Sequence, residues 1–182
     1  LFRSNIQLIE NITKLGMDGE ISFSESLEKR IRLIDSTVHE INKTVEKLHD
    51  LITPSFKKNK AFLEKNRDNI FIVSSGFHEL IDPVVNNLGI KPENVFANNF
   101  KILNDRISGF DSTNILSKDQ GKAKLVGGMK LEGTIHVIGD GYTDFEIKKE
   151  GFADKFYLFT ENIKRESLSK NADYLLKSQI GR

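Results

Sequence analysis

Two carboxylates and two glycines follow the clearest strand-like segment of the sequence. Gly139-Asp140-Gly141 comes directly after residues 134–138, and Asp144 stands four positions beyond Asp140. Glycine allows a tight turn and a close approach of the backbone to a ligand. Because the two aspartates span the turn and the start of the next predicted helix, we expect both carboxylates to face one pocket. Carboxylate oxygens suit Mg²⁺, which commonly takes only one or two protein carboxylates.

A second cluster of small polar residues, Ser74-Ser75-Gly76, follows the apolar segment Ile70–Val73. In open α/β sheets, ligands bind at the carboxyl ends of the strands, so both clusters are candidates for one site. Each feature alone also has an ordinary structural interpretation. Gly139-Asp140-Gly141 is compatible with a plain turn, Ser74 with a helix N-cap, and Lys122 with a solvated surface lysine.

Strands and helices must alternate to bring these residues together, and from residue 70 onward the sequence has that pattern. The predicted strands cover residues 70–73, 95–97, 134–138, 155–159 and 173–175. The predicted helices cover residues 77–88, 122–130, 145–150 and 161–168. Asn104-Asp105, between two short apolar segments, predicts a hairpin. This alternation indicates an α/β fold with a parallel sheet that is covered on both faces.

The first 50 residues, in contrast, predict helices only. Apolar residues recur with helical spacing from Leu8 to Leu15, and further helices are expected to begin at Ser22 and at Thr37. Each of these two residues is followed three positions later by a glutamate, as in a capping box. We therefore expect a helical cap domain over residues 1–52 and an α/β core domain over residues 53–182.

Composition restricts the class of protein. The 182 residues carry 27 Lys and Arg against 26 Asp and Glu, a net charge of +1, so there is no basic excess for nucleic-acid binding. No cysteine is present, which excludes disulfides and thiolate metal sites in this sequence. No apolar run approaches the ~20 residues that span a bilayer, so no membrane partner is expected. A reducing cytoplasm is the expected location.

Taken together and in this order, these motifs resemble the phosphatases of the haloacid dehalogenase superfamily, and among them the phosphoserine phosphatase branch. In that branch a strand ends in a Ser-Gly-Gly-Phe-like turn, and a lysine and then Gly-Asp-Gly-x-x-Asp follow. The matching segments here are Ser74-Ser75-Gly76-Phe77, Lys122 and Gly139-Asp140-Gly141-Tyr142-Thr143-Asp144. The spacing of Met17, Phe23 and Arg30 also fits the cap of that family.

The resemblance implies a Rossmann-like parallel sheet with a small helical cap. It also implies a Mg²⁺-dependent hydrolase that acts on a small phosphate monoester, phosphoserine foremost, through an aspartyl-phosphate. The implied catalytic residues are Ser74, Lys122 and Asp144, and the implied metal ligand is Asp140. The implied substrate-binding residues are Met17, Phe23, Arg30, Ser75, Gly76 and Thr143. A looser likeness around Phe159–Ile163 suggests a subgroup in which this domain precedes a phosphoglycerate dehydrogenase.

The sequence departs from the family pattern at two points. Ser75 stands where the family has glycine, which crowds the place of a phosphate. The family's nucleophile, the first aspartate of an Asp-x-Asp-x-Thr/Ser motif on the central strand, has no counterpart, because the 182 residues contain no Asp-x-Asp. Phe110-Asp111-Ser112-Thr113 follows the predicted hairpin, and we interpret it as a turn.

We therefore expect the first, nucleophile-bearing strand to lie upstream of Leu1. Two alternatives stay open. One is a regulatory or interaction domain that lacks the nucleophile and binds a phosphorylated amino acid without hydrolysing it. The other is a phosphatase of the same superfamily that acts on another small phosphate ester.

Overall fold

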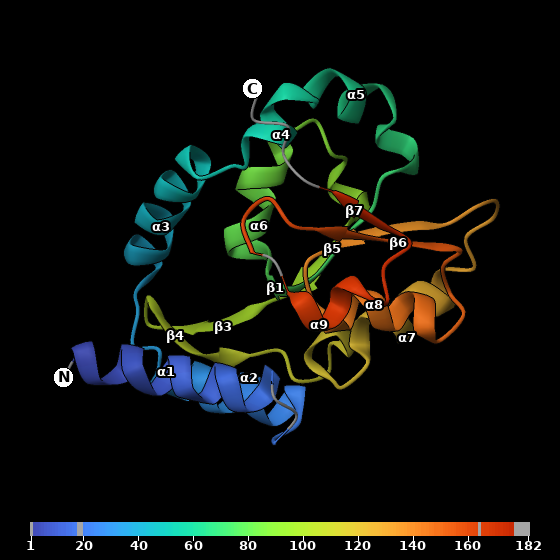
Figure 1. The fold of residues 1–182 in the computed structure, drawn as a ribbon. Coiled ribbons are helices and arrows are strands. Elements are labelled where there is room, and N and C mark those ends of the chain that lie inside the picture. Colours follow the sequence, from blue (N-terminus) through green and yellow to red (C-terminus); the bar gives the residue numbers. More distant parts are fainter. Residues whose placement is uncertain (1, 18–19, 164, 177–182) are drawn as a thin grey trace, which may run out of the picture. The chain divides into compact units, whose positions relative to one another are not determined.

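A computed structural model describes residues 2–17, 20–163 and 165–176 (Figure 1). The chain divides into two compact units. The first unit comprises residues 1–52 and 60–119, and the second comprises residues 53–59 and 120–182. The expected assignment of residues 1–52 to a cap domain and residues 53–182 to a core domain stays a prediction.

Three helices open the first unit, and the starts of the second and third agree with the predicted caps. They are α1 (Phe2–Met17), α2 (Phe23–Leu33) and α3 (Val38–Asp50). Ser22 is the N-cap of α2 and accepts a hydrogen bond from the backbone N–H of Glu25 at 3.1 Å. Thr37 caps α3 in a complete capping box, in which the carboxylate of Glu40 accepts from the Thr37 N–H. Such caps satisfy backbone donors that the first turn of a helix leaves free.

The first unit also holds a pair of parallel strands, β1 (Ile72–Phe77) and β2 (Val95–Asn98), with α6 (His78–Asn86) following β1. The prediction of a loop at Ser74-Ser75-Gly76 was wrong, because β1 continues through these residues to Phe77. The pairing register shifts between Val73 and Phe77, so the predicted loop is instead an irregular part of the strand. An irregularity of this kind redirects side chains and leaves backbone groups unpaired.

The predicted hairpin is confirmed. Strands β3 (Phe100–Leu103) and β4 (Arg106–Phe110) pair antiparallel through a two-residue turn. Asn104 and Asp105 have φ angles of 49° and 63°, the left-handed values that such a turn requires at both positions. The predicted turn at Asp111 is also present, since its carboxylate accepts the N–H of Thr113 at 2.9 Å.

The remaining helical segments of the first unit are short. They are α5 (Lys60–Lys65) and the 3-10 turns η1 (Arg67–Asn69), η2 (Pro92–Asn94) and η3 (Ile115–Ser117). A hydrophobic cluster links α2 to the end of β1, because Leu27 and Ile31 are buried against Phe77. The ring of Phe77 also stacks on Phe100, with centroids 3.8 Å apart and planes at 8°. This packing fixes α2 and the hairpin against the residue that follows Gly76.

The second unit is built on three parallel strands in the order β5-β6-β7. They are β5 (His136–Gly139), β6 (Lys155–Phe159) and β7 (Tyr174–Leu176). The helices of this unit are α4 (Pro54–Lys58), α7 (Gly121–Met129), α8 (Tyr142–Lys149) and α9 (Glu166–Ser169). Phe156 and Leu158 of β6 are fully buried and pack with Leu168. The predicted helix over 161–168 is reduced to α9, and α8 begins three residues earlier than predicted.

Each parallel sheet has an open edge among the described residues. Strand β1 pairs with β2 alone, and β5 pairs with β6 alone. Ile138 of β5 is 58% exposed, an unusual value for an isoleucine in a parallel strand. The architecture of parallel strands alternating with helices is the predicted α/β class, and the sheet is present as two separate pieces.

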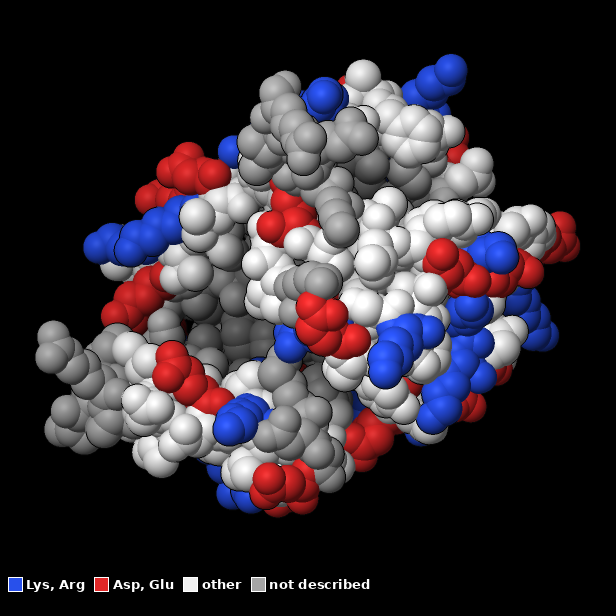
Figure 2. All heavy atoms as spheres, in the orientation of Figure 1, with Lys and Arg blue, Asp and Glu red and all other residues white. Residues whose placement is uncertain are grey.

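On the face shown in Figure 2, acidic and basic side chains lie interspersed, in keeping with the nearly balanced charge of the sequence. In the described part of the chain, every helix is too short or too polar to cross a membrane.

Candidate active site

An ion pair between Lys122 and Asp144 is the centre of the candidate site in the second unit. Lys122 Nζ donates to Asp144 Oδ1 at 2.7 Å, and the two side chains are only 14% and 12% exposed. Lys122 is the second residue of α7 and Asp144 the third of α8, so the two helix starts bring them together. The attraction between two nearly buried charges offsets the cost of removing them from water only when their geometry is good, as it is in this pair.

The second oxygen of the same carboxylate fixes the loop that precedes α8. Asp144 Oδ2 accepts the backbone N–H of Gly141 at 3.1 Å, as a capping residue does. Both oxygens of Asp144 are therefore engaged, one with the lysine and one with the glycine-rich turn. Thr143, next to it at the start of α8, is half-buried.

Gly139 makes this arrangement possible. A β-carbon on residue 139 would lie 2.2 Å from both the carboxylate carbon and Oδ2 of Asp144, a distance that real β-carbons do not adopt. The glycine at the end of β5 is thus required for the close approach of the Asp144 side chain rather than for a positive φ angle.

Asp140 has a different environment from Asp144. Its side chain is 52% exposed, and Oδ2 lies 3.7 Å from a guanidinium nitrogen of Arg165. Arg165 Nε also donates to the backbone oxygen of Asp140 at 3.0 Å. Arg165 was not predicted from the sequence, because it comes from the segment before α9 and no local motif marks it.

These environments decide which carboxylate fits a metal ion. Asp144 is occupied by Lys122 and by Gly141, whereas Asp140 presents an exposed carboxylate at the end of β5. No group of three metal-binding side chains occurs among the described residues. A single carboxylate still fits Mg²⁺, which takes further ligands from phosphate oxygens and water.

In the first unit, Ser74, Ser75 and Gly76 form the irregular part of β1, in which a side-chain hydrogen bond closes a local turn of the strand. Ser74 Oγ accepts the backbone N–H of Gly76 at 3.0 Å. Because a hydroxyl can accept and donate at once, its hydrogen stays available for a further acceptor. A β-carbon on Gly76 would lie 3.0 Å from Ile81 Cδ1, so this position has little room for a side chain. Ser75, the departure from the family pattern, is half-buried.

The predicted cap residues lie on α2, in the same unit. Phe23 packs on the cluster that includes Phe77, so α2 lies against the residue that follows Gly76. Arg30 is half-buried, its Nε donates to the backbone oxygen of Ser26 at 3.2 Å, and burial lowers its pKa. No carboxylate is within ion-pair distance of Arg30 among the described residues. Met17 ends α1, and its side chain lies outside the described part of the chain.

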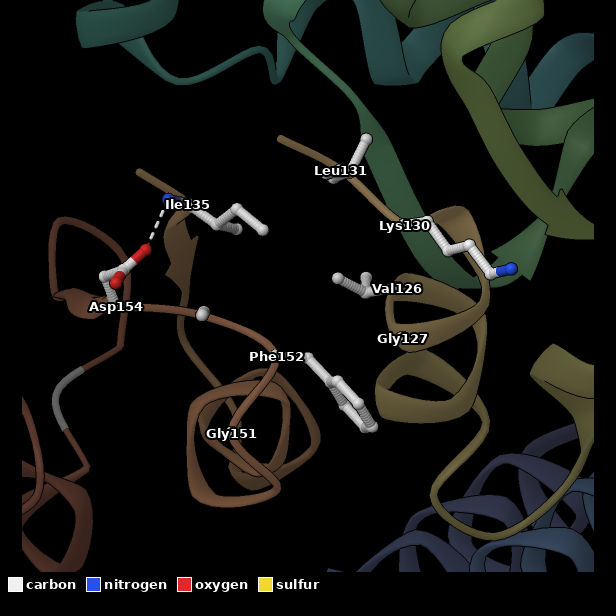
Figure 3. Close-up of a pocket in the computed structure, with 9 residues that line it drawn as sticks. Val126, Gly127, Lys130, Leu131, Ile135, Gly151, Phe152 and Asp154 are labelled. Carbon is white, nitrogen blue, oxygen red and sulfur yellow. Dashed lines mark hydrogen bonds between the residues drawn. The ribbon is translucent and has the colours of Figure 1, made fainter. Parts of the chain in front are cut away.

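A separate cavity of about 230 Å³ lies in the second unit (Figure 3). Ile135 and Asp154, which line it, precede β5 and β6, whereas Asp140 follows the carboxyl end of β5. A β-carbon on Gly127 would lie 2.7 Å from the ring of Phe152, which shows how tightly one wall is packed. Because it is at the amino ends of the strands, this cavity is not part of the candidate active site.

The chain is similar in sequence to curated phosphoserine phosphatases. The chain is 34% identical over 168 residues to the chloroplastic phosphoserine phosphatase of Arabidopsis thaliana, covering 90% of this chain and 57% of that protein. It is 29% identical over 172 residues to the phosphoserine phosphatase of Rattus norvegicus, covering 92% of this chain and 76% of the relative. The chain thus spans little more than half the length of the first relative. No family model matches it.

A solved structure gives the same indication. The crystal structure of a phosphoserine phosphohydrolase-like protein from Francisella tularensis superposes with a TM-score of 0.83 at 32% sequence identity. This match covers 96% of the present chain and 82% of that one.

Proposed function

Because the chain belongs to the phosphoserine phosphatase-like proteins of the haloacid dehalogenase superfamily, we propose that the whole protein is a phosphomonoesterase whose substrate is phosphoserine. The observation that carries the proposal is the nearly buried pair of Lys122 and Asp144 beside Asp140. Its contact with Asp144 holds Lys122 next to the start of α8, which follows the carboxyl end of β5, and a lysine held there is suited to binding a phosphoryl oxygen.

In this proposal, Lys122 and the Ser74 hydroxyl bind the phosphoryl oxygens and stabilise the charge that develops on them. Asp144 positions Lys122 through the 2.7 Å hydrogen bond. Ser75, Gly76 and Thr143 are the further residues that we propose bind the substrate. The acceptor role of Ser74 Oγ toward Gly76 supports this assignment, since it directs the hydroxyl hydrogen away from the backbone.

Asp140 is the proposed Mg²⁺ ligand of this chain, since its carboxylate is exposed and Asp144 is engaged elsewhere. When bound, Mg²⁺ supplies positive charge that offsets the negative charge of the phosphoryl oxygens. The guanidinium of Arg165, 3.7 Å from Asp140, contributes further positive charge at this loop and holds the Asp140 backbone.

The proposed nucleophile is an aspartate on a strand upstream of Leu1. It attacks the phosphorus, the serine oxygen leaves, and water then hydrolyses the aspartyl-phosphate. Two observations support this assignment. The sequence contains no Asp-x-Asp, and β1 and β5 each have an open edge among the described strands. Fusion to a phosphoglycerate dehydrogenase stays a prediction that the length of the parent chain will decide.

Arg30 is the proposed ligand of the substrate carboxylate. A half-buried guanidinium without a carboxylate partner in the described part of α2 and its surroundings can form a bidentate pair with an incoming carboxylate. Phe23 and Met17 are proposed to form apolar walls that exclude water from the site.

The test is release of inorganic phosphate by the full-length protein from a panel of phosphate monoesters, with and without Mg²⁺. We expect Mg²⁺-dependent hydrolysis with phosphoserine preferred over sugar phosphates and nucleotides. A preference for another small ester would contradict the proposed substrate but support the proposed reaction. Saturable binding of phosphoserine without phosphate release would instead identify a domain that lacks the nucleophile, and would overturn the proposed activity.

A further inference from the structure

Asn98, the last residue of β2, is a fully buried amide that connects two turns of the first unit. Its exposed fraction is 0%, and its Nδ2 donates to the backbone oxygen of Ser75 at 3.0 Å. The same nitrogen donates to the backbone oxygen of Leu116, in η3, at 3.4 Å. Two carbonyl acceptors on one side fix the orientation of the amide, because the flipped form would place three oxygens together.

The other end of this side chain argues against a role in packing alone. Asn98 Oδ1 is buried and has no hydrogen-bond partner in the described part of the chain. A buried acceptor without a partner costs free energy, which an apolar residue of similar volume would avoid. The unpaired Oδ1 therefore destabilises the folded state, and the two hydrogen bonds donated by Nδ2 are the compensating contribution of an asparagine at this position.

The bond to Ser75 completes a clamp on a single peptide group. The Ser75 oxygen and the Gly76 N–H belong to the same planar unit. The oxygen accepts from Asn98, while the N–H donates to Ser74 Oγ at 3.0 Å. A planar group that is held at both polar ends cannot rotate about its flanking bonds without breaking one of the two hydrogen bonds.

The irregularity in β1 explains why a side chain is needed here. Between Val73 and Phe77 the pairing with β2 shifts register, so the regular ladder between the strands is interrupted at Ser75. Asn98, which pairs with Phe77 in the resumed register, reaches back with its side chain to the Ser75 oxygen.

We propose that Asn98 is a positioning residue for the reaction. By holding the Ser75–Gly76 peptide, it keeps Ser74 Oγ in its role as acceptor of the Gly76 N–H and so directs the serine hydroxyl hydrogen toward the phosphoryl group. Asn98 touches neither substrate nor metal, and its effect passes through Ser75. This assignment rests on the proposed function.

The chain offers a matched control just before the start of the same strand. Asn94 is 8% exposed, and its Nδ2 donates to the backbone oxygen of Arg67 at 2.9 Å. Asn94→Ala and Asn98→Ala thus both remove a buried amide that donates to a carbonyl, but only the second removes a contact with the Ser74-Ser75-Gly76 turn.

Both variants are made in the full-length protein, and turnover of phosphoserine, inhibition by inorganic phosphate and thermal stability are measured. For Asn98→Ala we expect turnover to fall by ~10²-fold, as misplacement of a reacting group typically costs. We expect its inhibition constant for phosphate to rise ~10-fold, the equivalent of one hydrogen bond of ~1.4 kcal/mol. Asn94→Ala should lower thermal stability comparably and leave both kinetic quantities within about twofold. Equal kinetic losses in the two variants would overturn the proposal.

A readout without catalysis separates this proposal from the proposed function. Amide hydrogen exchange at Gly76 should accelerate in Asn98→Ala and stay unchanged in Asn94→Ala, because only the first releases the clamped peptide. If no ester is hydrolysed, the proposed function fails, while the Gly76 exchange rate still decides the role of Asn98. If Asn98→Ala does not fold, Asn98→Ser takes its place, and unchanged exchange in that variant contradicts the clamp.

Discussion

Gly139 and Asp144 are so close that the space of a β-carbon at residue 139 is filled by the carboxylate of residue 144. A methyl group on Gly139 would lie 2.2 Å from the carboxylate carbon. We therefore expect Gly139→Ala to displace Asp144 and break its bond to Lys122, with a loss of turnover as large as that of Asp144→Asn. Steady-state kinetics of both variants will test this.

Gly128 provides the control. It lies in α7, and a β-carbon there would meet nothing within 4 Å. Gly128→Ala should keep full activity and gain ~0.5–1 kcal/mol of stability from helix propensity. Full activity of Gly139→Ala would show that Asp144 has no role in positioning Lys122.

Lys122 is nearly buried, whereas Lys124 in the same helix is exposed, so the two lysines form a matched pair for mutation. Lys122→Ala should lower turnover by ~10²–10³-fold, the typical effect of removing one donor to a developing oxyanion. Lys124 is exposed, and Lys124→Ala should stay within a few-fold of the unmodified enzyme. Both are measured in one assay at saturating Mg²⁺. If Lys124→Ala is the inactive variant, the assignment of the phosphate-binding lysine is wrong.

Asp140→Asn should abolish Mg²⁺-dependent activity and weaken Mg²⁺ binding, because it removes the exposed carboxylate at the end of β5. Isothermal titration of Mg²⁺ into the full-length protein gives the affinity directly. Asp154→Asn is the control, since Asp154 is at the opposite end of the sheet and accepts the N–H of Ile135 at 2.7 Å. Equal Mg²⁺ affinity of Asp140→Asn and the unmodified protein would contradict the assignment.

Arg30→Lys keeps the charge of the side chain but loses the planar fork that binds a carboxylate at two points. We expect KM for phosphoserine to rise by ~10-fold, as for the loss of ~1.4 kcal/mol of binding, and hydrolysis of an aryl phosphate without a carboxylate to change little. Arg32→Lys serves as the control, because Arg32 is on the same helix, 76% exposed and paired with Glu28 at 2.5 Å. Equal losses on both substrates would assign Arg30 a structural role.

Asp173 gives the fold a predictable response to acid. Lys148 donates to its carboxylate at 2.6 Å and the Phe156 N–H at 2.7 Å, and these contacts lower the pKa of Asp173 to about 2. Since the unfolded chain has the ordinary value of 3.8, this contribution to stability is complete above pH ~4 and is lost as the pH falls toward 2. The difference in urea midpoint between the unmodified protein and Asp173→Asn should therefore shrink between pH 4 and pH 2. A difference that stays constant over this range would contradict the assignment.

Features that depend on residues close together in the sequence could be predicted, whereas features that depend on distant residues could not. Ser22 and Thr37 cap their helices through residues three positions away, and Asn104-Asp105 adopts the turn angles by itself. A few neighbouring residues are therefore enough to predict these features. The strand end at Ser74 was misplaced because β1 continues past Val73 with a shifted register against β2, and the Ser75 oxygen there accepts from Asn98, 23 positions further along the chain. Lys122 and Asp144 were named as site residues through the resemblance, and their direct contact, across 22 positions, depends on the tertiary fold.

The start of α8 and the role of Arg165 show the same limit. Because Asp144 accepts the Gly141 N–H, α8 begins at Tyr142. The apolar pattern of the sequence begins only at Phe145 and does not indicate this earlier start. Arg165 acts on Asp140 from 25 positions away and belongs to no motif.

The open edge of β5 has a practical consequence for anyone who produces this chain by itself. Among the described residues β5 pairs on one side only, with β6, and the free edge of a strand beside an exposed apolar side chain such as Ile138 is a template for addition of another extended chain. The 182-residue polypeptide is therefore expected to self-associate in a concentration-dependent manner, which light scattering will detect.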